Sequence, residues 1–166
     1  MNMQSFKEFA AHKDGTYVAI EMSEQSKQML DRFVEMSLGL VERVDPSTYH
    51  CTVIYSRTPV PAAIHHPFQV GEGFEAKVLG YEVFPTKNDG KCLVMRLHCP
   101  AATNMNAWLT DKGATSDYDD YKPHTTLAYD TKQEFKIGQM PIPAFSLIFD
   151  KITVTPLEKD YVPANK

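Results

Sequence analysis

The chain has 166 residues, of which 43% are hydrophobic and 23% are charged. This balance is typical of a single globular domain and excludes a disordered chain. The formal net charge of -4 argues against a protein that coats long nucleic acid, although a few local cations would suffice to bind a small anionic ligand. Neither a signal core nor an apolar run long enough to span a membrane is present, so we expect a soluble, intracellular protein.

The first part of the chain predicts a strand, a helix and a second strand. Alternating residues over 16–22 predict the first strand. Apolar residues at helical spacing then predict a helix that Ser23 caps and Gly39 ends. A turn at 45–47 precedes the second strand, at 50–56.

The rest of the chain predicts a long hairpin, a short helix and two further strands. The hairpin turns through Asn88-Asp89-Gly90, a strong turn signal. Thr103 is expected to cap the helix, which ends at Gly113. The expected strands lie at 74–84, 91–99, 124–129 and 145–157, and the expected helix lies at 103–112.

The order strand, helix, strand occurs once before Pro59 and again after Phe74. This coarse repeat predicts an α+β fold in which two sheet-and-helix lobes face each other across a central cleft or share one curved sheet. No linker or low-complexity tract divides the chain. We therefore expect a single bilobal domain over 1–166, with lobes at about 1–60 and 70–166.

Two of the predicted strands begin with the same pattern: His, any residue, Thr, two apolar residues and Tyr, at 50–55 and 124–129. Successive side chains of a strand alternate between its faces, so His50 projects with Thr52, and His124 projects with Thr126. The tyrosine that closes each pattern is expected to point the other way, into the core. Neither His-x-Thr triplet is persuasive alone, but the complete six-residue pattern is far rarer by chance.

Two such histidines suit the cleavage of a phosphodiester, which needs a base for the attacking hydroxyl and an acid for the leaving oxygen. Histidine can do either near neutral pH, because its unperturbed pKa is about 6.5. The threonine hydroxyls can donate hydrogen bonds to the non-bridging phosphate oxygens. The two patterns therefore predict phosphodiester chemistry without a metal, and they leave open which histidine is the base.

With these motifs the sequence resembles the two-histidine (2H) phosphoesterase superfamily, whose hallmark is two His-x-Thr/Ser motifs on facing strands of a bilobal fold. More narrowly, it is similar to the phage anti-CBASS cyclic-oligonucleotide phosphodiesterases, which destroy cyclic di- and trinucleotide signals of bacterial antiphage defence. The strings that carry this narrower resemblance are Phe6-Lys7-Glu8-Phe9, Gly15-Thr16-Tyr17-Val18, His50-Cys51-Thr52 and Tyr55-Ser56-Arg57.

The resemblance implies a catalytic tetrad of His50, Thr52, His124 and Thr126. It also implies that a ribose 2′-hydroxyl attacks the adjacent 3′-phosphate and forms a 2′,3′-cyclic phosphate, which water then hydrolyses. No cofactor is implied, and the place of action would be the cytoplasm of the infected bacterial host. The substrate would be a small cyclic oligonucleotide rather than long nucleic acid or a membrane.

Recognition of nucleobases predicts aromatic side chains on which the bases can stack. Tyr17 is the first candidate, because its strand is expected to neighbour the His50 strand. Phe84 and Tyr161 are further candidates for stacking, and Glu158 could accept a hydrogen bond from an adenine amino group.

Other polar side chains predict no metal site. The three cysteines are an odd number without a Cys-x-x-Cys pair, which predicts buried, reduced thiols. His65, His66 and His98 lack a nearby carboxylate or cysteine that would complete a ligand set. The acidic stretch 117–120 is expected to be a solvated loop, and the residues after it, Tyr121 or Lys122, could help to close the pocket.

Two rival functions fit the same motifs. An enzyme that processes RNA ends would cleave 2′,3′-cyclic phosphates or 2′,5′ linkages, but the chain has no basic stripe for long RNA. A sponge that sequesters cyclic nucleotides without cleaving them would need no acid and no base. The sequence makes no prediction about oligomeric state, because it contains neither heptads nor a long apolar edge.

Overall fold

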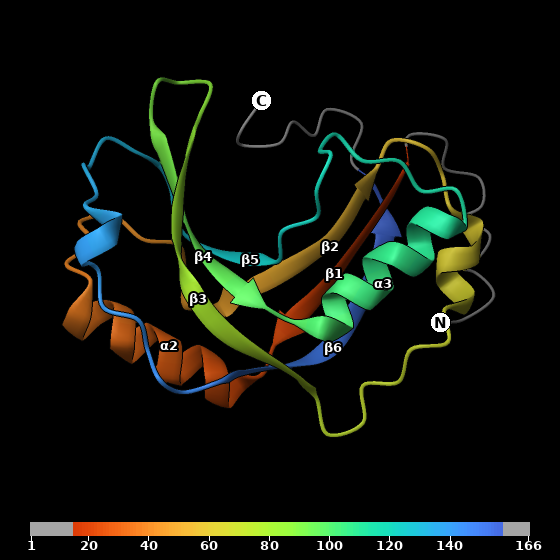
Figure 1. Ribbon diagram of the computed structural model, residues 1–166, viewed down its shortest axis with the longest axis horizontal. Helices are drawn as coiled ribbons and strands as arrows, with labels where there is room; N and C mark the ends of the chain where they lie inside the picture. Colours follow the sequence, from red (N-terminus) through yellow and green to blue (C-terminus); the bar gives the residue numbers. More distant parts are fainter. Residues whose placement is uncertain (1–14, 158–166) are drawn as a thin grey trace.

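Six antiparallel strands form one sheet in the computed structural model of the chain, which describes residues 15–157 (Figure 1). The strand order is β2-β1-β6-β3-β4-β5, so β2 and β5 are the two edges. The strands are β1 (Thr16–Met22), β2 (His50–Ser56), β3 (Phe74–Pro85), β4 (Lys91–His98), β5 (His124–Thr131) and β6 (Leu147–Pro156). Two α-helices accompany them within the described residues, α2 (Glu24–Ser37) and α3 (Pro100–Asp111).

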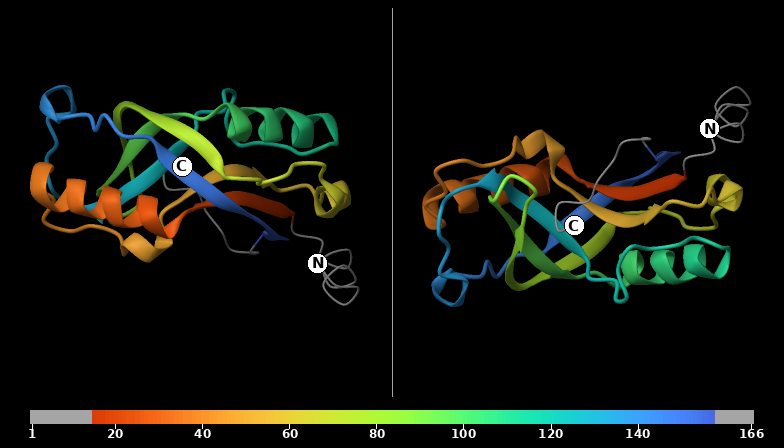
Figure 2. Two further views of the ribbon diagram at one scale, coloured as in Figure 1. Left: turned by 90° about the horizontal axis from the view of Figure 1, so that it is seen from below. Right: turned by 90° about the horizontal axis from the view of Figure 1, so that it is seen from above.

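The sheet has two halves: β2, β1 and β6 form one, and β3, β4 and β5 form the other. The long strand β3 joins them by pairing with both β6 and β4. Its first residues, Phe74 to Ala76, pair with β6, whereas Lys77 to Pro85 pair with β4. The sheet curves strongly, so that its two edge strands, β2 and β5, contact each other (Figure 1). Figure 2 shows α2 and α3 at opposite ends of the molecule. The predicted α+β fold is confirmed, and the two halves share one curved sheet.

The division into lobes at about 1–60 and 70–166 stays a prediction. In the sheet, β6 pairs with β1 along its length and with the start of β3. The C-terminal strand β6 therefore lies in the sheet between β1 and β3.

Local sequence signals place most of the element ends correctly. The Ser23 hydroxyl caps α2 by accepting a hydrogen bond from the Ser26 amide at 3.2 Å. After this helix, Gly39 has φ +60°, the left-handed conformation that favours glycine. The start predicted for α3 is wrong: the helix begins at Pro100, and the carbonyl of Cys99 rather than the side chain of Thr103 opens it. Proline suits the first turn because its missing N–H would have no helical partner there.

Apolar side chains from every strand fill the core. All three cysteines are buried, and none forms a disulfide. The largest fully buried side chains include Ile20, Leu30, Leu93, Leu127 and Phe149. Across residues 15–157, no helix is long and apolar enough to cross a membrane.

Candidate active site

A pocket of about 700 Å³ lies where the edge strands β2 and β5 meet. His50, Thr52, His124 and Thr126 all line it, so the fold brings the two His-x-Thr motifs together. The volume is within the usual range for a small-molecule site. The pocket is therefore large enough for a small-molecule ligand.

Each motif strand is anchored by the residue that precedes its histidine. The carbonyl of Tyr49 accepts a hydrogen bond from the Met22 amide on β1 at 3.2 Å. At the equivalent place in the other half, the carbonyl of Pro123 accepts from the Leu97 amide on β4 at 2.9 Å. Both histidines thus begin strands that are fixed to a neighbouring strand just before their first residue.

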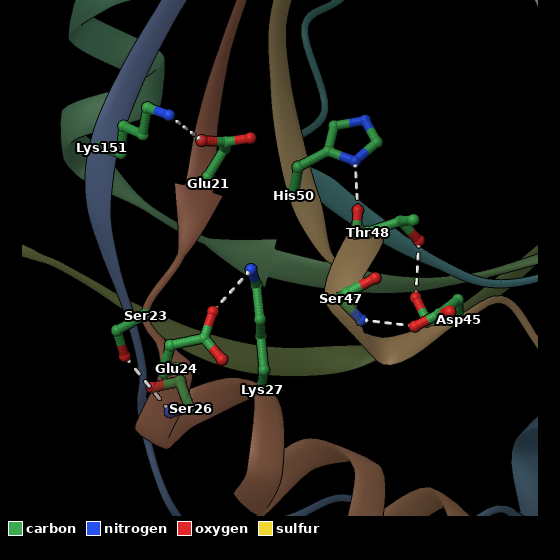
Figure 3. A network of polar contacts seen from close by, with 10 residues as sticks. All are labelled: Glu21, Ser23, Glu24, Ser26, Lys27, Asp45, Ser47, Thr48, His50 and Lys151. Atoms are coloured by element: carbon green, nitrogen blue, oxygen red, sulfur yellow. Dashed lines mark hydrogen bonds and ion pairs between the residues drawn. The ribbon is translucent and has the colours of Figure 1, made fainter.

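Both imidazole rings are held in the same way by the backbone. Nδ1 of His50 lies 2.7 Å from the carbonyl oxygen of Thr48, as Figure 3 shows, and Nδ1 of His124 lies 2.8 Å from that of Lys122. A carbonyl oxygen only accepts, so Nδ1 carries the hydrogen in both rings. Each Nε2 can therefore accept a proton when the ring is neutral and donate one when the ring is charged.

A rigid turn supports the carbonyl that holds His50. The Asp45 carboxylate accepts from the Ser47 amide at 2.9 Å, and the Asp45 carbonyl accepts from the Thr48 hydroxyl at 2.6 Å (Figure 3). They support a 3₁₀ turn over Pro46–Thr48, which the backbone N–H groups of Thr48 and Tyr49 close by donating to the carbonyls of Asp45 and Pro46 at 2.9 and 3.2 Å. The sequence predicted the turn but not its role in orienting the histidine.

A β-bulge interrupts each motif strand after its threonine. On β2, Thr52 pairs with Ala19 and Ile54 pairs with Val18, which leaves Val53 as the extra residue. On β5, Thr126 and Ala128 pair with successive residues of β4, which leaves Leu127 as the extra residue. An extra residue resets the alternation of side chains along a strand.

The bulges turn the motif tyrosines toward the pocket, so the prediction that these tyrosines point into the core is wrong. Both Tyr55 and Tyr129 line the cavity, while both apolar residues before each of them are buried. Tyr129 remains 55% exposed. The sequence signal for each bulge is a pair of consecutive apolar residues within the strand. A prediction that assumes strict alternation of side chains overlooks this signal.

The carbonyl of each bulged residue is satisfied by the other half of the molecule. The Val53 carbonyl on β2 accepts from the Asn106 amide side chain on α3 at 2.9 Å. The Leu127 carbonyl on β5 accepts from the backbone N–H of Val44 at 3.0 Å. Each half therefore holds the bulge of the other, and both donors line the pocket.

Replacing Asn106 by alanine is expected to lower the free energy of unfolding by about 1–3 kcal/mol, because the Val53 carbonyl loses its donor. Urea unfolding measures the loss. Asn104→Ala is the matched control, since Asn104 is exposed on the same helix, and its change should stay within about 0.5 kcal/mol. Equal losses for the two variants would show that the bulge does not depend on Asn106.

Thr52 lies among the hydroxyl groups of aromatic side chains. Next to Thr52, the hydroxyl of Tyr17 lies 3.4 Å from the Thr52 hydroxyl, and the Tyr17 ring stacks on Tyr55 with centroids 4.9 Å apart. Burial raises the pKa of Tyr17, so its hydroxyl keeps its proton. The Tyr121 hydroxyl donates to the Thr52 carbonyl at 2.8 Å. The first motif is thus held by aromatic hydroxyls.

Of the four candidates for base recognition, Phe84 lines the pocket. Its ring is roughly perpendicular to that of His124, at 6.0 Å between centroids. Tyr17 packs behind Thr52, and its role in base recognition stays a prediction. Glu158 and Tyr161 lie outside the described residues.

His124 lies among groups that shift the pKa of its imidazole. Burial lowers the pKa of His124, and the nearby Arg96 and His50 lower it further, whereas Lys122, through its carbonyl, and Glu82 act against this. The Arg96 guanidinium pairs with the Glu82 carboxylate at 2.7 Å. The result favours a neutral imidazole near neutral pH.

Comparison with known proteins places the chain in a family. The family model described as "Anti-CBASS protein Acb1" matches residues 14–164. The chain belongs to the Acb1 family. Anti-CBASS protein Acb1 of Enterobacteria phage T4 is 32% identical over 160 residues, covering 96% of this chain and 97% of the relative. The Acb1 protein of Vibrio phage KVP40 is 37% identical over 116 residues, covering 70% and 73%.

Solved structures agree with this fold. A crystal structure titled as a phosphoesterase has a TM-score of 0.55 at 16% identity, covering 86% of this chain and 87% of the other. Escherichia coli LigT, crystallised with NADP+, also has a TM-score of 0.55, at 14% identity and 86% coverage of both chains. At such identities the likeness concerns the fold alone. The predicted resemblance to Acb1 proteins is confirmed, and the fold agrees with that of these solved structures.

In this Acb1-family chain, the segment from Ser116 to Lys122 forms one wall of the pocket. The Arg57 guanidinium holds it by donating from Nε and Nη2 to the Asp117 carboxylate, at 3.0 to 3.2 Å. The acidic stretch that the sequence predicted as a solvated loop therefore contributes to the site. Tyr121 and Lys122 both line the pocket.

Sequence reasoning missed several residues of the Acb1-family pocket, among them Val44, Glu82 and Asn106. None of these belongs to a recognisable local motif. Sheet pairing and the loops between elements bring them to the site, and a single sequence carries no signal for either. Over the part of the chain that the structure describes, no three His, Cys, Asp or Glu side chains gather where they could share a metal ion.

Proposed function

We propose that this protein is a metal-independent phosphodiesterase that opens 3′–5′ bonds of cyclic di- and trinucleotide immune signals and so helps a phage to evade CBASS defence. The observation that carries the proposal is the matched pair of imidazoles. Each has its Nδ1 held by a backbone carbonyl, and both line one pocket with two threonines. Membership of the Acb1 family supports the anti-CBASS role.

The proposed reaction begins with a ribose 2′-hydroxyl that attacks the adjacent 3′-phosphate. One neutral imidazole accepts the hydroxyl proton at Nε2, while the other, protonated imidazole donates a proton from Nε2 to the leaving 5′-oxygen. A bond forms between the 2′-oxygen and phosphorus, and the bond to the 5′-oxygen breaks. The hydroxyls of Thr52 and Thr126 donate to the non-bridging oxygens. Water then hydrolyses the 2′,3′-cyclic phosphate to a terminal phosphate.

The shape and the lining of the pocket favour a small nucleotide ligand. Phe84 and Tyr129 provide aromatic surfaces on which bases can stack, worth about 1–3 kcal/mol per base. Lys122 provides a cation at the wall for phosphate. The net charge of -4 disfavours long RNA as the substrate. Because the target signals are bacterial, we place the activity in the cytoplasm of the infected host.

A substrate panel in EDTA tests this function. The protein is incubated with cyclic di- and trinucleotides, with 2′,3′-cyclic mononucleotides and with 2′,5′-linked dinucleotides, and products are separated by chromatography. Linear products from the cyclic oligonucleotides support the proposal. Cleavage of the other two classes alone would show an enzyme of RNA ends. Cyclic ligand recovered intact after denaturation would show a sponge.

A further inference from the structure

We propose that Arg96 and Glu82 are positioning residues that act through His124 and make it the general base, so that His50 is the general acid. This inference rests on the proposed function, whose chemistry requires one histidine in each role. The observation behind it is a difference in charge between two equivalent places in the sheet.

The residue directly opposite each catalytic histidine carries a charge, and the two charges have opposite signs. On β4, Arg96 pairs in register with His124, whereas on β1, Glu21 pairs in register with His50. Residues directly opposite in an antiparallel pair project on the same face, with Cβ atoms about 4.5–5.5 Å apart. A cation therefore lies next to His124, and an anion lies next to His50.

The next strand inward carries the opposite charge in each half. Arg96 pairs with Glu82 of β3 at 2.7 Å. Glu21 pairs with Lys151 of β6 at 3.3 Å, a contact that Figure 3 draws. From the edge inward, the order is histidine, cation, anion in one half and histidine, anion, cation in the other. The order of charges is therefore reversed between the two halves, although Lys151 lies directly opposite Glu21, whereas Glu82 lies two residues along from Gly80, the residue opposite Arg96.

The ion pair near His124 is the less exposed of the two. The side chains of Arg96 and Glu82 are 23% and 32% exposed, compared with 70% and 40% for Lys151 and Glu21. Charges that water screens less interact more strongly with their neighbours. The Arg96–Glu82 pair is therefore the one that controls its histidine more strongly.

Arg96 is a fixed positive charge, because a guanidinium does not lose its proton in a protein. Its Nε is buried and has no hydrogen-bond partner among the described residues, so the Glu82 carboxylate is its neutralising contact. Glu82 lines the pocket together with His124. The cation thus lies beside His124, and the anion that neutralises it lies on the pocket wall.

The groups around His124 agree with this arrangement. Burial lowers the pKa of His124, and the positive charges of Arg96 and His50 lower it further. Glu82 and the hydrogen bond to the Lys122 carbonyl oppose the decrease. A neutral imidazole at neutral pH can accept the proton of a 2′-hydroxyl, which is the requirement for a base.

The pH profile of kcat/KM tests this assignment, because its acid limb reports the base of the free enzyme and its alkaline limb reports the acid. In Arg96→Gln the Glu82 carboxylate is left uncompensated, so the acid limb should move to higher pH. In Glu82→Gln the guanidinium is left uncompensated, so the acid limb should move to lower pH. Each shift should be on the order of half a pH unit or more.

Two variants serve as matched controls. Arg96→Lys keeps the positive charge, and its acid limb should stay within the error of the wild-type profile. Glu21→Gln changes the charge at the equivalent place in the other half, and it too should leave the acid limb in place. Acid limbs that move equally in all four variants would overturn the specific role of Arg96 and Glu82.

An NMR titration of the His124 imidazole without substrate gives a second reading that does not depend on turnover. Opposite shifts of its midpoint in Arg96→Gln and Glu82→Gln support the inference even if a variant turns over poorly. A moved alkaline limb with an unmoved acid limb would make His124 the acid, and an unmoved titration would show a structural role alone. Either result overturns the inference while the two-histidine mechanism stands. If the wild type opens no cyclic nucleotide, the proposed function itself fails, together with the role of base.

Discussion

Replacing His124 or His50 by alanine is expected to lower kcat for opening a cyclic dinucleotide by about 10²- to 10⁴-fold. Each imidazole presents its Nε2 to the pocket because a backbone carbonyl holds its Nδ1. Alanine removes the acid or the base and keeps the strand. Because the two histidines act in one step, the double variant should be scarcely slower than either single variant. Single-turnover rates with saturating enzyme measure this effect.

A histidine outside the pocket provides the control for these variants. His98 is exposed at the end of β4, and His98→Ala should keep kcat within about twofold of the wild type. His124→Asn retains an N–H donor but cannot act as a base, so it should be as slow as the alanine variant. Near-normal turnover in either catalytic variant would contradict the mechanism.

Replacing Thr52 or Thr126 by valine is expected to lower kcat by about 10²- to 10³-fold, with a smaller change in KM. Valine has nearly the same shape as threonine but lacks the hydroxyl that would donate to the phosphate oxygens. These donors matter most in the transition state, where negative charge develops. Steady-state kinetics on a cyclic dinucleotide separates kcat from KM.

Serine at the same positions keeps the hydroxyl and should recover most of the rate. A smaller loss in Tyr17→Phe is expected, because the Tyr17 hydroxyl contacts the Thr52 hydroxyl and would act on the substrate only through it. If the valine variants raise KM and leave kcat unchanged, the threonines bind the substrate without stabilising the transition state.

The contacts that line the pocket also cover the two edge strands of the sheet. β2 and β5 are edge strands, and exposed edges invite pairing with other chains. Here each edge is covered by a segment from the other half: Tyr121 and Asn106 bond to carbonyls of β2, and Val44 bonds to β5. The same contacts line the pocket, so protecting the edges and shaping the site are one arrangement.

The fold was largely predictable because its signals are local. Alternation over 16–22, the Ser23 cap and the Asn-Asp-Gly turn each depend on residues close in sequence, and the structure agrees with all three. The start of α3 was misplaced because Thr103 looks like a cap, whereas Pro100 already fits the first turn.

The site was predictable only in part, for a physical reason. The His-x-Thr triplets are local patterns, so alternation along one strand was enough to pair each histidine with its threonine. The tyrosines were misplaced because a bulge is set by pairing with the neighbouring strand, which alternation within one strand ignores. Arg96 and Glu82 were missed because only the strand order β3-β4-β5, which brings distant parts of the chain together, places them near His124.

The most direct test of the central claim is a ³¹P NMR time course of a cyclic dinucleotide with the wild-type protein in excess EDTA. If two histidines drive attack by the 2′-hydroxyl, a 2′,3′-cyclic phosphate should form first and decay to a terminal phosphate. A substrate that lacks the attacking 2′-hydroxyl should bind and stay intact. Turnover that requires an added divalent metal, or cleavage of the substrate that lacks this hydroxyl, would contradict the account.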